Sequence, residues 1–160
     1  MTVKEKYVLD VCCGSRMFYF DKNSKDVLFC DNRHLSETLC DGRKLEIHPD
    51  MIADFRGLPF DGNSFNLVIF DPPHLNKIGS SSWLAKKYGS LPEQNWKEYL
   101  GQGFSECWRV LANHGTLVFK WNENQIKLSE LEPLFPCTPL FGDRSKGVHT
   151  FFLVFFKNQA

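Results

Sequence analysis

Residues 65–74 read FNLVIFDPPH, and this stretch decides the fold class. Its four consecutive apolar residues, 67–70, are typical of a β-strand that is covered on both faces, as in a parallel sheet. The run stops at an acid followed by two prolines, which fix the backbone and have no N–H to donate. The stretch therefore predicts a buried central strand that ends in a rigid corner.

Short apolar runs recur on both sides of this strand. The expected strands are Tyr7–Val11, Val27–Cys30, Met51–Ala53, Leu67–Phe70, Thr116–Lys120, Pro139–Phe141 and Thr150–Lys157. Apolar spacings of three and four predict a helix at Gln94–Leu111, which Gly115 follows in a left-handed turn. A second helix is expected at Glu123–Leu131, before Pro133. This order predicts an α/β fold with a Rossmann-like, doubly wound, mostly parallel sheet of about seven strands, the last two forming an antiparallel hairpin.

The connections at residues 12–26 and 31–50 carry little helical pattern. One face of the sheet is therefore expected to have thin cover. Three explanations stay open: a surface for a partner subunit, a homodimer, or irregular loops packed by aromatic and sulfur-containing side chains. In the third explanation, the side chains that pack the loops would be Met17, Phe18, Tyr19 and Phe20.

Length and composition limit the function classes. The 160 residues fit a single domain, 1–160, and the equal numbers of basic and acidic residues, 19 each, argue against a general nucleic-acid clamp. Any site for a polyanion must then be a local patch. The six cysteines form no C-x-x-C pair, so we expect reduced, buried thiols and no metal site. Without an apolar leader or a run of about 20 apolar residues, we expect a cytoplasmic protein with no membrane partner.

Acids stand at the ends of three expected strands, where open α/β sheets bind their ligands. Asp10 is followed by Cys12 and by Gly14, whose turn would let the backbone approach a ligand closely. Asp10 could hold a cationic or hydroxyl-bearing group, such as the amino group of a methionine moiety. Asp31 lies at the distance from Gly14 that is usual for an acceptor of ribose hydroxyls. Each acid could also be an ordinary turn residue.

A third segment, residues 53–60, reads ADFRGLPF. Asp54 could accept a hydrogen bond from an adenine amino group, with Phe55 or Leu58 against the ring. A solvated turn acid is the alternative for Asp54.

The corner formed by Asp71, Pro72, Pro73 and His74 is the most specific signal in the chain. A planar amino group has two hydrogens, which the Asp71 carboxylate and the Pro72 carbonyl could accept together. Accepting both would localise electrons on the nitrogen and favour its attack on a methyl group. His74 could stack on the ring that carries the amino group. A rigid turn before a long loop is the alternative.

Residues 75–94 form an expected long loop directly after this corner, and such loops are usually functional or disordered. Basic residues between aromatic ones suit contacts to phosphates and stacked bases. A mobile surface loop is the alternative for this segment. Two further basic residues near the same edge, in the fifth strand and in the last turn, could also contact substrate. The candidate substrate residues are Lys77, Trp83, Lys86, Lys87, Tyr88, Lys120 and Arg144.

Three motifs carry a resemblance to a known family. Residues 53–68 resemble the passage from strand three to strand four of the class I S-adenosylmethionine-dependent methyltransferases. Residues 108–117, WRVLANHGTL, resemble the family's turn before strand five. Residues 71–74 resemble the DPPY-type motif of amino-methylating members, here DPPH, and within this set the chain is most similar to small DNA methyltransferase-like proteins of phages and mobile elements.

The resemblance implies S-adenosyl-L-methionine as cofactor, with S-adenosyl-L-homocysteine as product. It implies methyl transfer to an exocyclic amino nitrogen of a nucleic-acid base, adenine N6 or cytosine N4, in DNA rather than RNA. The chain departs from the family where Cys12 and Arg16 occupy common glycine positions, and it has no separate target-recognition domain. A protein or small-molecule N-methyltransferase and a non-catalytic cofactor-binding module remain as alternatives.

Overall fold

The computed structural model describes residues 6–143, 147 and 149–159. The strands in chain order are β1 (Val8–Asp10), β2 (Val27–Asp31), β3 (Leu35–Thr38), β4 (Lys44–Ile47), β5 (Met51–Ile52), β6 (Phe65–Phe70), β7 (Leu111–Asn122), β8 (Phe141–Gly142) and β9 (Thr150–Phe156). The helices are α1 (Trp83–Tyr88), α2 (Trp96–Val110) and α3 (Leu128–Leu131), and a 3₁₀ turn follows at Glu132–Leu134. Within the described residues, no helix is both long and apolar enough to cross a membrane.

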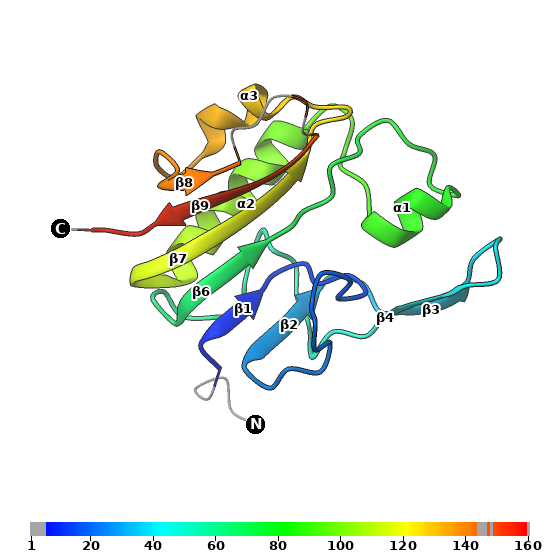
Figure 1. Cartoon of the computed structure of the whole chain (residues 1–160), viewed down its shortest axis with the longest axis horizontal. Helices are drawn as coiled ribbons and strands as arrows, with labels where there is room; N and C mark the ends of the chain where they lie inside the picture. The colour runs from blue at the N-terminus through cyan, green and yellow to red at the C-terminus, as the bar shows by residue number, and fades with distance from the viewer. Residues whose placement is uncertain (1–5, 144–146, 148, 160) are drawn as a thin grey trace.

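Seven strands form one sheet in the order β5-β2-β1-β6-β7-β9-β8 (Figure 1). The first five strands in this order run parallel, and β9 pairs antiparallel with both β7 and β8. The expected Rossmann-like α/β sheet with a final antiparallel hairpin is confirmed. The chain moves outward from β1 to β2 and β5, then restarts at β6 on the other side of β1. The carboxyl ends of β1 and β6 therefore flank the point where the strand order reverses.

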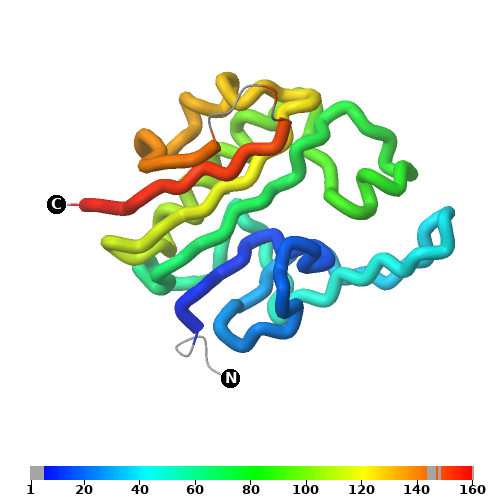
Figure 2. The backbone as a smooth tube through the Cα atoms, viewed as in Figure 1, coloured from blue at the N-terminus to red at the C-terminus, as the bar shows by residue number. Residues whose placement is uncertain are grey.

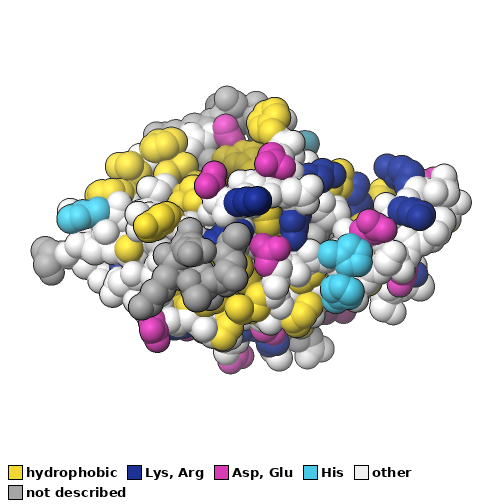
Figure 3. Space-filling view, turned by 90° about the horizontal axis from the view of Figure 1, so that it is seen from below, with side chains coloured by type: hydrophobic (Ala, Val, Ile, Leu, Met, Phe, Trp, Pro, Cys, Tyr) yellow, Lys and Arg dark blue, Asp and Glu magenta, His cyan; other side chains and the backbone are white. Residues whose placement is uncertain are grey.

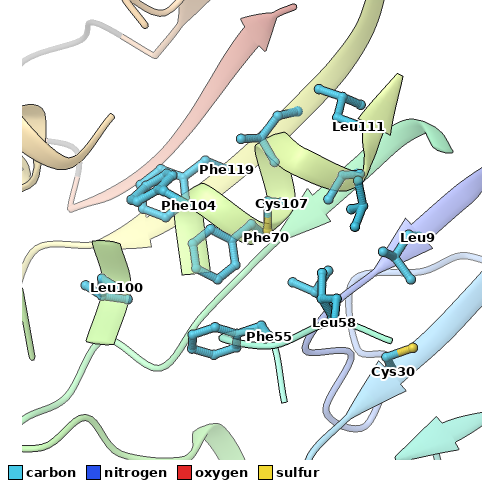
Figure 4. Close-up of a cluster of buried hydrophobic side chains, with 14 of the residues drawn as sticks. Leu9, Cys30, Phe55, Leu58, Phe70, Leu100, Phe104, Cys107, Leu111 and Phe119 are labelled. Atoms are coloured by element: carbon cyan, nitrogen blue, oxygen red, sulfur yellow. The ribbon is translucent and has the colours of Figure 1, made fainter. Parts of the chain in front are cut away.

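Helix α2 packs on one face of the sheet and closes the main core (Figure 4). The helix is amphipathic as predicted, with Leu100, Phe104 and Cys107 buried against the sheet. Gly103 allows the close approach, because a Cβ there would lie 2.7 Å from the ring of Phe70 and 2.8 Å from that of Phe55. The helix is thus held directly behind the strand that ends at Asp71.

The opposite face has thin cover, as the sequence predicted. In Figure 1, no helix in the described part of the chain lies in front of β6, β7 and β9. The loop after β1 packs only in part: Tyr19 lies against Phe29, whereas Phe20 is fully exposed. Phe152 and Phe156 of β9 remain 37% and 39% exposed on this face.

Several local expectations were wrong. The second helix begins at Leu128 rather than residue 123. Before it, side-chain oxygens accept backbone hydrogen bonds in place of helical carbonyls: Asn122 accepts the Asn124 N–H and Glu123 accepts the Leu128 N–H. The expected loop 75–94 contains helix α1. An unpredicted hairpin, β3–β4, occupies the connection between β2 and β5 and projects from the sheet (Figure 2).

The turn after α2 also differs from its prediction. The left-handed residue is His114, with φ 64°, and not Gly115. Glycine is needed at 115 for space, since a Cβ would lie 2.7 Å from the Ala112 carbonyl oxygen. All six cysteines are free, but Cys40 and Cys137 are exposed, which corrects the expectation of buried thiols at these two positions.

Candidate functional site

Asp10 ends β1 at the point where the strand order reverses. Its side chain is 1% exposed and accepts hydrogen bonds from the Tyr19 hydroxyl at 2.7 Å and the Cys12 N–H at 3.1 Å. Burial raises the pKa of Asp10 to about 7, against the opposing effect of these two hydrogen bonds, and the nearby carboxylates of Asp71 and Asp31 raise it further. The site therefore holds a carboxyl group that a cationic ligand would ionise.

The turn after β1 contains two residues with left-handed backbone conformations. Gly14 has φ 51°, and Arg16 has φ 57°, a left-handed value that glycine more often supplies. The Arg16 guanidinium holds this turn by donating to the carbonyls of Lys22 and His48, both at 2.7 Å. Arg16 thus links this turn to the segment that follows β4.

Asp31 ends β2, and its carboxylate already accepts hydrogen bonds from within the protein. It is 2% exposed and accepts the Gly14 N–H at 2.8 Å and the Arg33 Nε at 3.0 Å. Arg33 also donates to the Lys86 carbonyl in α1 at 2.9 Å. Ribose hydroxyls could bind Asp31 only by replacing Arg33, so this arginine controls access to the carboxylate.

The Asp71 carboxylate follows β6 and has acceptor capacity left for a ligand. Its one hydrogen-bond partner among the described residues is the Lys120 Nζ, 3.4 Å from Oδ2, and no described residue donates to the Pro72 carbonyl. Burial raises the pKa of Asp71, while the positive charge of Lys120 and its hydrogen bond oppose the rise. Two oxygen acceptors of the corner are thus available to a donor with two hydrogens.

His74 closes the corner. It is half-buried, and its ring centroid lies 5.8 Å from that of Tyr88 and 6.3 Å from that of Trp121. Burial lowers the pKa of His74, and the charge of Lys120 lowers it further, so the imidazole is neutral at neutral pH. The corner therefore carries an uncharged flat ring beside the Asp71 carboxylate.

Two adjoining cavities meet at Asp71. One has a volume of about 250 Å³ and is lined by Asp10, Gly14, Pro72, His74 and Lys120, among others. The other has a volume of about 300 Å³ and is lined by Asp31, Phe55, Pro73 and Tyr99, among others. Asp71, Cys12, Arg33 and Tyr88 line both. Together the cavities fall within the range of about 300–1,000 Å³ that is typical of small-molecule sites.

Most of the predicted site residues line these two cavities. In the order of the chain, they are Asp10, Cys12, Gly14, Asp31, Phe55, Asp71, Pro72, Pro73, His74, Lys86, Lys87, Tyr88 and Lys120.

Four other predicted residues line neither cavity. Asp54 is bound through both carboxylate oxygens by Arg56, at 2.7 Å and 3.0 Å. Leu58 is 5% exposed and belongs to the core. Lys77 and Trp83 are exposed at the surface. Arg144, the last candidate, lies outside the described residues.

Sequence reasoning missed three residues that shape the site. Tyr19 binds Asp10, Arg33 binds Asp31, and Tyr99 lines the second cavity. Tyr99 belongs to the predicted apolar face of the helix, so its periodicity indicated core packing rather than a ligand. Arg33 stands two positions after Asp31, and this short spacing was the available signal.

Comparisons with known proteins identify the fold. No family model matches the chain, and no curated protein sequence matches it. In all, 23 chains of solved structures match, and one of them is the PH0226 protein from Pyrococcus horikoshii OT3. This match has a TM-score of 0.56 and 17% sequence identity, and it covers 96% of this chain and 82% of the other. The two proteins share the Rossmann-like α/β fold.

Proposed function

We propose that this chain is an S-adenosylmethionine-dependent methyltransferase that acts on an exocyclic amino nitrogen of a nucleic-acid base, in DNA in preference to RNA. One observation carries the proposal: Asp71 lines both cavities and leaves its carboxylate accessible beside the Pro72 carbonyl. A donor and an acceptor of a methyl group could therefore meet at this residue from two sides.

The residues present fit the cofactor. The cavity at the ends of β2 and β6 offers Phe55 and Tyr99 for an adenine ring and Asp31 for ribose hydroxyls, once Arg33 has moved. The other cavity offers Asp10 for an ammonium group. When bound, S-adenosylmethionine supplies a methyl group on a sulfonium. We infer that the cofactor spans the two cavities beside Asp71.

The corner residues orient the substrate nitrogen. Asp71 and the Pro72 carbonyl accept its two hydrogens, which localises the lone pair toward the methyl group. The neutral imidazole of His74 lies against the flat base. The bound cofactor would supply the methyl group, and the Asp71 carboxylate, whose pKa burial raises, would accept the proton that the substrate nitrogen gives up on methylation. Positioning and hydrogen bonding supply the acceleration, without a covalent enzyme intermediate.

The surroundings of the corner favour a nucleic-acid base over other amines. Lys87 and Lys120 line the cavity that contains Pro72 and His74, which we call the catalytic cavity, and Tyr88 lies beside His74. Cations next to aromatic rings suit a phosphate and a stacked base. The base must leave its stack to reach Asp71, which costs a few kcal/mol in a duplex and less in a single strand.

The test measures transfer of a labelled methyl group from S-adenosylmethionine to DNA, RNA and protein fractions, together with cofactor binding by calorimetry. Asp71→Ala should abolish transfer and leave cofactor affinity nearly unchanged. Asp61→Ala, which removes an exposed acid, is the control and should change neither quantity. Equal loss of transfer and binding in Asp71→Ala would reject the assigned role.

The same measurement separates the alternatives. The net charge of zero favours a protein or small-molecule substrate, and label in the protein fraction alone would support that interpretation. The occupation of Asp31 by Arg33 favours a non-catalytic module. Cofactor binding without transfer to any fraction would support it.

A further inference from the structure

A basic groove lies beside the catalytic cavity, between the loop after β1 and the β3–β4 hairpin. Its cationic residues are Arg16, Lys22, Arg43, Lys44 and Lys87, and its acidic residues are Glu46 and Asp50. Arg43 is paired with Asp41 at 2.6 Å and Arg16 with Asp50 at 3.5 Å, so the charged lining residues that form no ion pair among the described residues are the three lysines and Glu46. The groove has a volume of about 690 Å³. In a chain with no net charge, this local excess of positive charge is the kind of patch that a polyanion requires.

The three lysines of the groove are available to a ligand. Within the part of the chain that the structure describes, Lys22, Lys44 and Lys87 form no ion pair. Lys22 and Lys44 are exposed, and they come from opposite walls of the groove. Figure 3 shows lysine and arginine side chains, with acidic ones among them, at the end of the molecule that contains the hairpin.

Arg16 holds the two walls together. Its guanidinium donates to the Lys22 carbonyl in the loop and to the His48 carbonyl beyond β4, and it stacks on Phe29 at 3.9 Å. It also pairs with Asp50 at 3.5 Å, which neutralises one of the two acids. Contacts of Arg16 therefore connect the loop that carries Lys22 to the segment that follows the strand carrying Lys44.

The groove continues into the catalytic cavity. Gly14, Ser15, Met17 and Lys87 line both spaces. A chain of phosphates lying in the groove would lead directly to a base held at Asp71. An acidic peptide would match the charge but would bring no base to the corner.

We propose that this basic groove binds the phosphodiester backbone of a single polynucleotide strand next to the target nucleotide. The proposal rests on the proposed function, because it assigns the site's substrate to nucleic acid. The β3–β4 hairpin then supplies a substrate contact next to the catalytic cavity. The groove contacts phosphates and not base edges, so it binds strands of any sequence with an affinity that depends on the salt concentration.

The test measures binding of fluorescein-labelled single-stranded DNA and RNA oligonucleotides by the full chain at several salt concentrations, using anisotropy. Lys22→Ala/Lys44→Ala should weaken binding at low salt by about tenfold or more, and should reduce the slope of log K against log salt by about 0.7 for each phosphate that is no longer neutralised. Lys97→Ala/Lys127→Ala removes two exposed lysines away from the groove and should leave both quantities unchanged. Thermal unfolding verifies that both variants fold.

The outcomes distinguish the groove from the proposed reaction. Equal losses of affinity in both double variants, or binding that depends on the groove for polyglutamate but not for oligonucleotides, would overturn the proposal. Methyl transfer to DNA that is unaffected by Lys22→Ala/Lys44→Ala at every salt concentration would also overturn it, while leaving the proposed function intact. Groove-dependent oligonucleotide binding without any methyl transfer would support the groove and reject the reaction. Comparison of the DNA and RNA arms identifies which strand the groove prefers.

Discussion

Replacing Asp10 with asparagine should stabilise the free protein at alkaline pH. Burial holds the pKa of Asp10 at about 7, compared with 3.8 in an exposed chain. One pKa unit corresponds to about 1.4 kcal/mol, so the folded protein disfavours the ionised carboxylate by about 4 kcal/mol. The folded chain keeps this proton over a range in which the unfolded chain has released it. The free energy of unfolding therefore falls as pH rises from about 4 to 7, and about 3 kcal/mol of this loss lies between pH 5 and pH 8.

The assay is urea unfolding at pH 5 and pH 8. Asp10→Asn should remove about 3 kcal/mol of the wild-type difference between the two conditions, because the amide cannot ionise and the Tyr19 hydroxyl can rotate to accept from it. Asp26→Asn changes an exposed acid and should preserve the wild-type difference. An Asp10→Asn protein with the full wild-type difference would show that another group titrates in this window.

The same carboxylate should make cofactor binding depend on pH. A bound ammonium group favours the ionised form of Asp10, so wild-type affinity for S-adenosylmethionine should rise between pH 6 and pH 8. The groups that face Asp10 are Tyr19, Cys12, Asp31 and Asp71. Asp10→Asn should bind more weakly at pH 8 and lose most of the pH dependence, and unchanged affinity would remove Asp10 from the proposed site.

Three further predictions concern the core and the corner. Gly103→Ala should destabilise the fold by about 1–3 kcal/mol in urea unfolding, because its Cβ would strike Phe70 and Phe55, whereas Gly101→Ala has room, with the nearest atom at 3.6 Å, and should be neutral or stabilising. Arg33→Ala should destabilise the free protein by about 3 kcal/mol, because it leaves the buried Asp31 carboxylate without its cation. It should also enlarge the rise in Tm caused by S-adenosylmethionine, because Asp31 becomes accessible. Loss of cofactor binding would instead show that Arg33 itself contacts the cofactor. His74→Ala should lower kcat/KM by about 5- to 150-fold and His74→Phe should restore it, unless the imidazole acts by hydrogen bonding.

Hydrophobic pattern was sufficient to predict the sheet and its main helix. The apolar run of residues 67–70 lies in β6 between two parallel partners, and the spacing of three and four over residues 94–111 became α2. Both elements bury apolar side chains against the core, and this requirement produces the apolar pattern from which the element can be predicted. The predicted edges shifted by a few residues because strand ends are fixed by pairing partners that the pattern does not contain.

The missed elements are those that bury little. Helix α1 has no buried residue, and β3 has none either, so neither shows an apolar face. In the β3–β4 hairpin only Leu45 and Ile47 are buried, which is too few for alternation to be recognised. The hairpin carries two of the cations of the basic groove, Arg43 and Lys44. The hydrophobic pattern therefore could not predict the part of the candidate site that exposed elements form.

The strand-end acids separate into two kinds by a local rule. Three aspartates have an arginine two positions later, and in each pair the arginine donates both its backbone N–H and its Nε to the carboxylate; the pairs are Asp31–Arg33, Asp41–Arg43 and Asp54–Arg56. Such an acid is satisfied within its own turn and offers a ligand little unless the arginine leaves. Asp10 and Asp71 have no arginine at that spacing, and burial raises the pKa of both. The absence of a neighbouring arginine therefore distinguishes the two acids at the centre of the cavities from those whose charge is neutralised locally.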